Sequence, residues 1–194
     1  MIKVIIFDFG GIITYHGRIK TFCNKHYKSL NLTEEEMNSI VHKYWLPAKI
    51  NKIKSEEFWD NLSREFKCNR EELRTNLMAH FKINHDILNL IKKLKKKYKI
   101  VMLSNQIEDW LEEVIDKNKL KDIFDIIITS YDTKLAKPDI EIFKETIRII
   151  NTNPEECVFV DDQEANIKSA ETLGIKGILF INQSDLEKKL EEIL

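Results

Sequence analysis

The chain has 194 residues, of which 43% are hydrophobic and 32% charged, and its 31 basic and 32 acidic residues nearly cancel. This length predicts one compact domain of ordinary size with room for a small insertion. A net charge of -1 gives no reason to expect nucleic-acid binding. The densest basic run, residues 92–97, is explained by the solvated face and cationic end of a helix.

Membrane association and secretion are also not expected. No apolar stretch approaches the roughly 18 to 20 residues that span a bilayer. The first apolar run is interrupted by an acid and paired glycines, and no cleavage site of a signal peptide follows. Cys23, Cys68 and Cys157 are scattered without metal-ligand spacing, as reduced thiols are. We therefore expect a cytoplasmic protein that makes no contact with a membrane.

The first apolar run, Ile2 to Phe9, predicts a buried strand that carries a single carboxylate, Asp8, followed by Gly10 and Gly11. Residues from about 17 to 82 then show helical patterns and no convincing strand. The expected helices cover Ile19 to Leu30, a segment opened by Thr33 with Glu36 as a capping box, Ser55 to Phe66, and Asn69 to Phe81. This predicts an all-helical cap inserted after the first strand.

From about residue 84, helices and strands alternate. We expect helices at Asp86 to Tyr98, Ile107 to Lys117, Pro138 to Ile150, Glu164 to Leu173 and Ser184 to Leu194. Strands are expected at Lys99 to Leu103, Ile123 to Thr129, Cys157 to Val160 and Lys176 to Phe180. Such alternation predicts an α/β fold with a doubly wound parallel sheet. The predicted domains are a core of residues 1–16 and 83–194 and a cap of residues 17–82.

Polar side chains follow three of these strands. Parallel sheets bind ligands outside the carboxyl ends of their strands, so these side chains are expected to meet at one edge, with Asp8 presented there rather than buried. Taken singly, each has a structural explanation as a turn residue, a helix cap or a surface charge. Their combination is what indicates a site. The residues are Asp8, Ser104, Asn105, Asp161 and Asp162, with Lys137 in a loop that can reach the same edge.

In this order the four segments resemble the four motifs of the haloacid dehalogenase superfamily of hydrolases. The matching runs are VIIFDFGG around Asp8, VMLSN ending at Asn105, LAKPDIEIF around Lys137, and VFVDDQEANIKSAETLGI from residue 158. The resemblance extends from residue 2 to about residue 175. It implies a Rossmann-like core, and a helical insertion after an FDxGG motif is similar to subfamily IA with its C1 cap.

The resemblance further implies a Mg²⁺-dependent hydrolase of phosphoric monoesters. In this superfamily the carboxylate at the position of Asp8 attacks phosphorus, and water then hydrolyses the aspartyl-phosphate. The metal ligands implied are Asp8, Asp162 and the backbone carbonyl of Gly10, which suit the preference of Mg²⁺ for hard oxygen atoms.

The remaining motif residues receive supporting roles from the resemblance. Ser104 and Asn105 are expected to hydrogen-bond the phosphoryl oxygens, and Lys137 to neutralise charge on the nucleophile and the transferring group. Asp161 is expected to steer Lys137 or a metal-bound water from behind the metal ligands. Asn166 stands where many relatives carry another carboxylate, which predicts a weaker metal site.

Gly10 is the main departure from the superfamily pattern. Most phosphatases of the superfamily have a second Asp there, which protonates the leaving alcohol, and general acid–base catalysis supplies about 10² to 10⁴-fold. Three outcomes follow: Tyr15 or His16 substitutes, the substrate has a good leaving group, or catalysis is lost. Some relatives with an FDxG motif resemble working sugar phosphatases.

Three functions therefore compete. The first is a phosphatase of a small phosphorylated metabolite, with sugar phosphates as one class; the second is a weak or silent binding protein. The third, a 2-haloacid dehalogenase, also lacks the second Asp, but dehalogenases do not use the metal and have no need of Asp161 and Asp162. The acidic pair favours the phosphatase. The sequence predicts neither the substrate itself nor an oligomeric state.

Overall fold

In the computed structural model, which describes residues 1–16 and 19–194, five strands form one sheet in the order β3-β2-β1-β4-β5. The strands are β1 (Val4–Phe7), β2 (Lys99–Ser104), β3 (Ile126–Thr129), β4 (Cys157–Asp161) and β5 (Lys176–Leu179). All four neighbouring pairs are parallel, with Phe7 of β1 opposite Met102 on one side and Val160 on the other. The predicted α/β class is confirmed.

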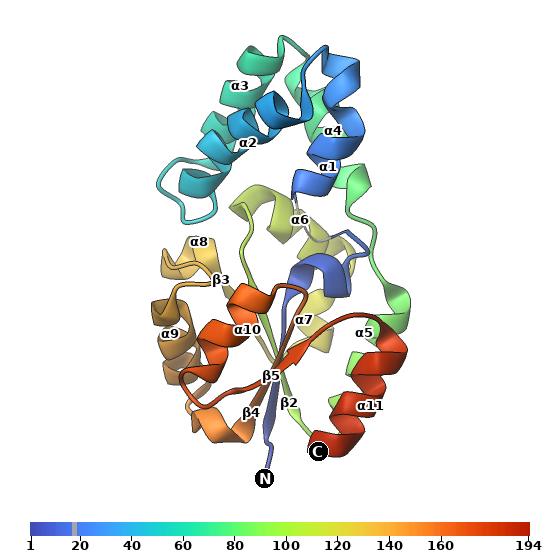
Figure 1. The fold of residues 1–194 in the computed structure, drawn as a ribbon, viewed down its shortest axis with the longest axis vertical. Coiled ribbons are helices and arrows are strands. Elements are labelled where there is room, and N and C mark those ends of the chain that lie inside the picture. The colour runs from blue at the N-terminus through green and yellow to red at the C-terminus, as the bar shows by residue number, and fades with distance from the viewer. Residues whose placement is uncertain (17–18) are drawn as a thin grey trace.

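Helices cover both faces of the sheet (Figure 1). Ile5 and Phe7 point into one layer, whose helices are α5 (His85–Leu94), α6 (Glu108–Lys117) and α11 (Gln183–Ile193). Val4 and Ile6 point into the other layer, formed by α9 (Ile140–Ile150) and α10 (Glu164–Glu171). Because both faces are buried, the strands are continuous apolar runs rather than alternating ones.

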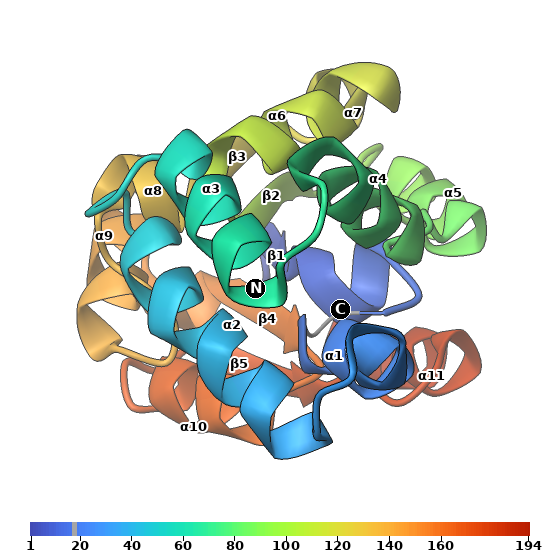
Figure 2. The same cartoon turned by 90° about the horizontal axis from the view of Figure 1, so that it is seen from above.

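A helical segment lies over the carboxyl edge of the sheet (Figures 1 and 2). It contains α1 (Ile19–His26), a turn at Tyr27–Leu30, α2 (Glu34–Ala48), α3 (Ser55–Phe66) and α4 (Arg70–His80). The chain leaves and re-enters the sheet layer at one antiparallel bridge between Thr14 and Ile83. The proposed division into a cap of residues 17–82 stays a prediction, and its first residue lies outside the described part of the chain.

The helical segment is fastened to α6 by polar contacts. The indole Nε1 of Trp59 donates to Asp109 Oδ2 at 3.0 Å, and the Arg74 guanidinium contacts the same carboxylate. Arg74 also pairs with Glu113 at 2.5 Å. Apolar contact accompanies these pairs, since the Trp110 ring packs 6.3 Å from that of Trp45, centroid to centroid. The segment is therefore held directly above the carboxyl ends of β1 and β2.

Some predicted boundaries are wrong. The strand expected at Ile123 to Thr129 begins only at Ile126, because Leu120–Ile123 forms the short helix α7. The helix expected to reach Tyr98 ends at Leu94, because the chain must turn there to enter β2 at Lys99. Two further short helices, α8 (Ser130–Thr133) and the turn Pro154–Glu156, were not predicted.

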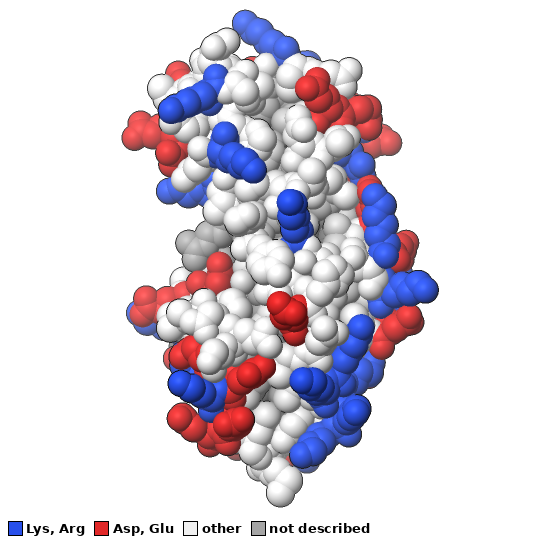
Figure 3. Space-filling view, turned by 90° about the vertical axis from the view of Figure 1, so that its right-hand side faces the viewer, with Lys and Arg blue, Asp and Glu red and all other residues white. Residues whose placement is uncertain are grey.

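The surface of the face shown in Figure 3 carries basic and acidic side chains together. One lysine of the basic run, Lys95, pairs with Asp125 at 3.1 Å. The three cysteines are free thiols, as expected. None of the helices in residues 1–16 and 19–194 is long and apolar enough to cross a bilayer.

The capping box at the start of α2 generates a stability prediction. The Thr33 hydroxyl accepts from the Glu36 N–H at 3.2 Å, and Glu36 accepts from the Thr33 N–H at 2.8 Å. Replacing the hydroxyl by a methyl group, in Thr33→Ala, is expected to lower the free energy of unfolding by about 1 kcal/mol. Urea denaturation measures this, and Thr33→Ser is the matched control that keeps the cap. Equal stability of the alanine and serine variants would contradict the prediction.

Candidate active site

The turn after β1 aims Asp8 at the edge of the sheet. The Asp8 N–H donates to the Val160 carbonyl at 2.9 Å, which ties the residue to β4. The turn Phe9–Ile13 then requires φ = 80° at Gly11, where a Cβ atom would lie 2.7 Å from Asp162 Oδ2. Glycine at position 11 is thus needed both for the turn and for the approach of Asp162. Gly10 has φ = -76° and ψ = 127°, which any residue adopts.

A buried lysine joins the ends of three strands. Lys137 is 3% exposed, and its Nζ lies 2.7 Å from Asp8 Oδ1 and 2.8 Å from Asp161 Oδ2. Nζ also donates to the Leu103 carbonyl at 2.9 Å. These contacts use all three N–H donors of an ammonium group. Burial alone would lower the pKa of Lys137, but Asp161 and Asp8 outweigh it and hold the pKa above 10.5.

Asn105 holds the backbone of Lys137. Its Oδ1 accepts from the Lys137 N–H at 3.0 Å, and its Nδ2 donates to the Lys137 carbonyl at 2.8 Å. This two-point contact fixes the loop that carries the ammonium. Contact of Asn105 with a phosphoryl group stays a prediction.

Asp161 is fully buried and surrounded by donors of this chain. Besides Lys137, it accepts from the Gln163 N–H at 2.8 Å and from Asn166 Nδ2, which lies 3.0 Å from each carboxylate oxygen. Asn166 therefore contacts Asp161, which gives a neutral amide a role at this position. Sequence reasoning missed the backbone partners Leu103 and Gln163, because a main-chain group leaves no signal in residue type.

Three carboxylates come together at this edge. One oxygen atom from each of Asp8, Asp161 and Asp162 lies within 4.8 Å of the others. Because Asp161 is occupied by Lys137, Asn166 and the backbone, Asp8 and Asp162 are the carboxylates that fit a divalent cation. Two carboxylates with several waters suit Mg²⁺.

Asp8 is buried, at 6% exposure, and the expectation that it is presented at the rim is wrong. Its position at the strand end is as expected, but Lys137 and the overlying helical segment close around it. Burial raises the pKa of Asp8 from 3.8 to about 7, with Lys137 opposing the shift. Ser104, 1% exposed at the end of β2, has no hydrogen-bond partner for its hydroxyl within the described chain.

A cavity of about 670 Å³ opens beside the carboxylates. Gly11 and Asp162 line it, together with Tyr15, His16, Thr21, Asn84, Phe180, Ile181, Asn182 and Gln183. The His16 ring stacks on His80 with 4.8 Å between centroids. Burial lowers the pKa of His80 to about 4, so this imidazole is neutral near pH 7. Both residues suggested as substitutes for the absent acid, Tyr15 and His16, therefore border the same cavity as Asp162.

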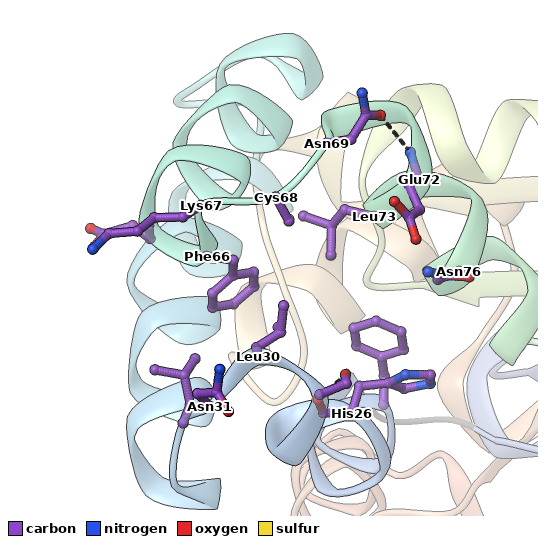
Figure 4. Close-up of a pocket in the computed structure, with 14 residues that line it drawn as sticks. His26, Leu30, Asn31, Phe66, Lys67, Cys68, Asn69, Glu72, Leu73 and Asn76 are labelled. Carbon is purple, nitrogen blue, oxygen red and sulfur yellow. Dashed lines mark hydrogen bonds between the residues drawn. The ribbon is translucent and has the colours of Figure 1, made fainter.

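A second cavity, of about 690 Å³, lies within the helical segment (Figure 4). Residues of α1, α3, α4 and their connections line it, with Phe66 and Leu30 close together and the Asn69 side chain accepting from the Glu72 N–H. None of the motif residues contributes to this lining. The cavity beside Asp162 is thus the one that the carboxylates can use.

Comparison with known proteins supports the resemblance. A family profile described as haloacid dehalogenase-like hydrolase matches residues 2–174. The chain is 29% identical to the D-ribitol-5-phosphate phosphatase of Bacteroides thetaiotaomicron, covering 100% of this chain and 99% of the relative. It is also 22% identical to drimenol cyclase drtB of Aspergillus calidoustus over its full length, but spans only 37% of that protein.

Solved structures share the fold as well. A haloacid dehalogenase family enzyme from Bacteroides thetaiotaomicron, in complex with magnesium and inorganic phosphate, superimposes with a TM-score of 0.82 and 27% identity. The match covers 96% of this chain and 99% of that one.

The raised pKa of Asp8 predicts how stability depends on pH without metal. Between about pH 4 and 7, folded Asp8 keeps a proton that the unfolded chain has released. The free energy of unfolding should therefore fall as pH rises through this window, by up to about 1.4 kcal/mol per pH unit. Urea denaturation of the metal-free protein measures the slope. Asp8→Asn, which cannot titrate, should show a shallower slope, and parallel curves would refute this assignment.

Proposed function

The chain belongs to the haloacid dehalogenase-like hydrolases, and we propose that within this family it is a Mg²⁺-dependent phosphatase acting through an aspartyl-phosphate on Asp8. The observation that carries the proposal is the buried cluster in which Lys137 Nζ lies 2.7 Å from Asp8 and 2.8 Å from Asp161. Relatives named as a phosphatase and as a magnesium and phosphate complex support it.

Asp8 is the nucleophile in this proposal. One carboxylate oxygen forms a bond to phosphorus as the bond from phosphorus to the ester oxygen breaks, and the ester oxygen leaves with the electron pair. Water then attacks phosphorus, and Asp8 is restored as inorganic phosphate leaves. Lys137 keeps Asp8 in place and offsets the negative charge around it. Ser104, whose hydroxyl is buried without a partner, is placed to donate to a phosphoryl oxygen.

The metal would be held by Asp8, Asp162 and the Gly10 carbonyl. Mg²⁺ supplies a Lewis acid that withdraws charge from the phosphoryl oxygens. Asp161 stays outside this set because Lys137 and Asn166 occupy it. Asn166 adds no negative charge, so the site carries a smaller total charge than one with a third acid at that position.

We further propose a small, neutral, hydroxyl-rich leaving group, such as a sugar or polyol. Polar uncharged side chains dominate the cavity beside Asp162, including Thr21, Asn84, Asn182 and Gln183. Lysine and arginine are absent from its lining among the described residues. A second phosphate or carboxylate on the substrate would therefore lack a partner there, whereas hydroxyl groups would find several.

Asp8→Asn tests the mechanism. The change keeps the volume of the side chain but removes the nucleophile, so Mg²⁺-dependent hydrolysis of p-nitrophenyl phosphate should fall by at least about 10³-fold while the circular dichroism spectrum is unchanged. Substantial activity in this variant would rule out the covalent route.

Calorimetric titration with Mg²⁺ provides the second measurement of this test. Asp162→Asn should weaken Mg²⁺ binding strongly, because it removes one of two metal carboxylates. Asn166→Ala is the matched control, since this amide touches Asp161 and not the metal. Absence of Mg²⁺ binding by the parent protein would overturn the proposal.

Gly10→Asp tests the missing proton donor. The backbone at Gly10 accepts any residue, and a carboxylate beside Asp8 would have a pKa raised by like-charge repulsion, which suits an acid near neutrality. The variant should accelerate alkyl phosphates more than p-nitrophenyl phosphate, whose leaving group hardly needs a proton. A parent enzyme equally fast on both classes would show that another group donates, and His16→Ala and Tyr15→Phe would then identify it.

A further inference from the structure

Three buried polar groups without partners lie in one short segment. The Ser104 hydroxyl, Gln106 Oε1 and Trp110 Nε1 are buried and make no hydrogen bond within the described chain. They fall between residues 104 and 110, at the end of β2 and the start of α6. Elsewhere in the described residues, the buried atoms without a partner belong to side chains that are otherwise paired, as Asp109 is with Trp59 and Arg74.

Such groups need an explanation because leaving them unpaired opposes folding. A buried donor or acceptor loses its contact with water and regains nothing, so native structures keep few of them. The proposed phosphoryl contact accounts for Ser104. Gln106 and Trp110 have no part in the mechanism described above, and an apolar residue at either position would fit the surroundings better.

Both residues lie close to the nucleophile. The Trp110 ring packs edge-on against Phe9, the residue after Asp8, with 6.5 Å between centroids. The Gln106 N–H donates to Ser130 Oγ at 3.3 Å, and that hydroxyl donates to the Lys49 carbonyl at 2.5 Å. Gln106 and Trp110 therefore lie where the helical segment meets the carboxyl edge of the sheet.

We propose that Gln106 and Trp110 form a specificity subsite that binds a hydroxyl group of the leaving alcohol. Oε1 of Gln106 is an acceptor and Nε1 of Trp110 is a donor, and a hydroxyl group is the common ligand that satisfies both kinds of atom. The inference rests on the proposed phosphatase function and assigns residues to its choice of substrate.

The helical segment covers this subsite through α2. Trp45 of α2 packs 6.3 Å from Trp110, and the Lys49 carbonyl after α2 rests on Ser130. The leaving group reaches Gln106 and Trp110 by entering between the end of α2 and the start of α6. Substrate hydroxyls then take the place that bulk water cannot occupy, and a substrate without them leaves both groups unpaired.

Two phosphates of equal chain length test the subsite. D-ribitol 5-phosphate carries hydroxyl groups that n-pentyl phosphate lacks, and kcat/KM is measured for both with Mg²⁺. The parent enzyme should prefer the polyol phosphate. In Gln106→Leu and in Trp110→Phe, the ratio of the two kcat/KM values should fall by about 10-fold, as expected when a site built to bond a hydroxyl loses a partner.

Trp59→Phe is the matched control. It removes the same volume as Trp110→Phe, but its indole N–H is paired with Asp109. The control should leave the substrate ratio unchanged. Because it breaks a hydrogen bond that Trp110→Phe does not, its Tm should lie about 2 to 4 °C below that of Trp110→Phe.

The outcomes separate the two proposals. If the parent hydrolyses neither phosphate, the phosphatase function fails, and the Tm comparison still judges whether Trp110 is unpaired. If the parent hydrolyses both but shows no preference, or if both variants keep the parent ratio, the subsite is overturned and the phosphatase function stands. Equal Tm values for Trp59→Phe and Trp110→Phe would also overturn it.

Discussion

The contact of one buried ammonium with two carboxylates organises this molecule. Lys137 comes from the loop before α9, Asp8 follows β1 and Asp161 ends β4, and the Leu103 carbonyl of β2 completes the set. Burying a charge is costly unless it is paired and hydrogen-bonded, so each member of this group requires the others. Asn105 and Asn166 hold the two ends of the arrangement. The position of the nucleophile is thus set by electrostatics that the sheet alone would not supply.

The same cluster opposes the ionised form of its own nucleophile. Burial raises the pKa of Asp8 despite Lys137, which means that the folded chain without metal holds this carboxylate in an unfavourable state. A divalent cation between Asp8 and Asp162 would relieve that cost, and metal binding would release a proton. Ser104, Gln106 and Trp110 show the same pattern in neutral groups, since each is buried without a partner. Strained or unsatisfied groups collect where ligands are expected and not elsewhere in the described core.

Sequence reasoning located the fold and the edge of the site because both depend on local patterns. Alternating helices and apolar strands indicate a parallel sheet, and such a sheet brings Asp8, Ser104 and Asp161 to one edge whatever the loops do. The burial of Asp8 could not be predicted, since it depends on how the helical segment closes. Nor could the contact of Asn105 with the Lys137 backbone, because side-chain partners across 32 positions leave no trace in spacing. The short helix α7 was missed because its four residues are too few to show a period.

The bridge between Thr14 and Ile83 has a consequence for how such a chain can diversify. The whole helical segment starts and finishes at neighbouring points above β1, the central strand of the sheet. An insertion of other length or shape with the same end spacing would leave the register of all five strands untouched. Residues that recognise the alcohol are then divided between an exchangeable insertion and the fixed start of α6. Selectivity can therefore change by exchange of a segment, whereas the groups that handle phosphorus are inherited with the sheet.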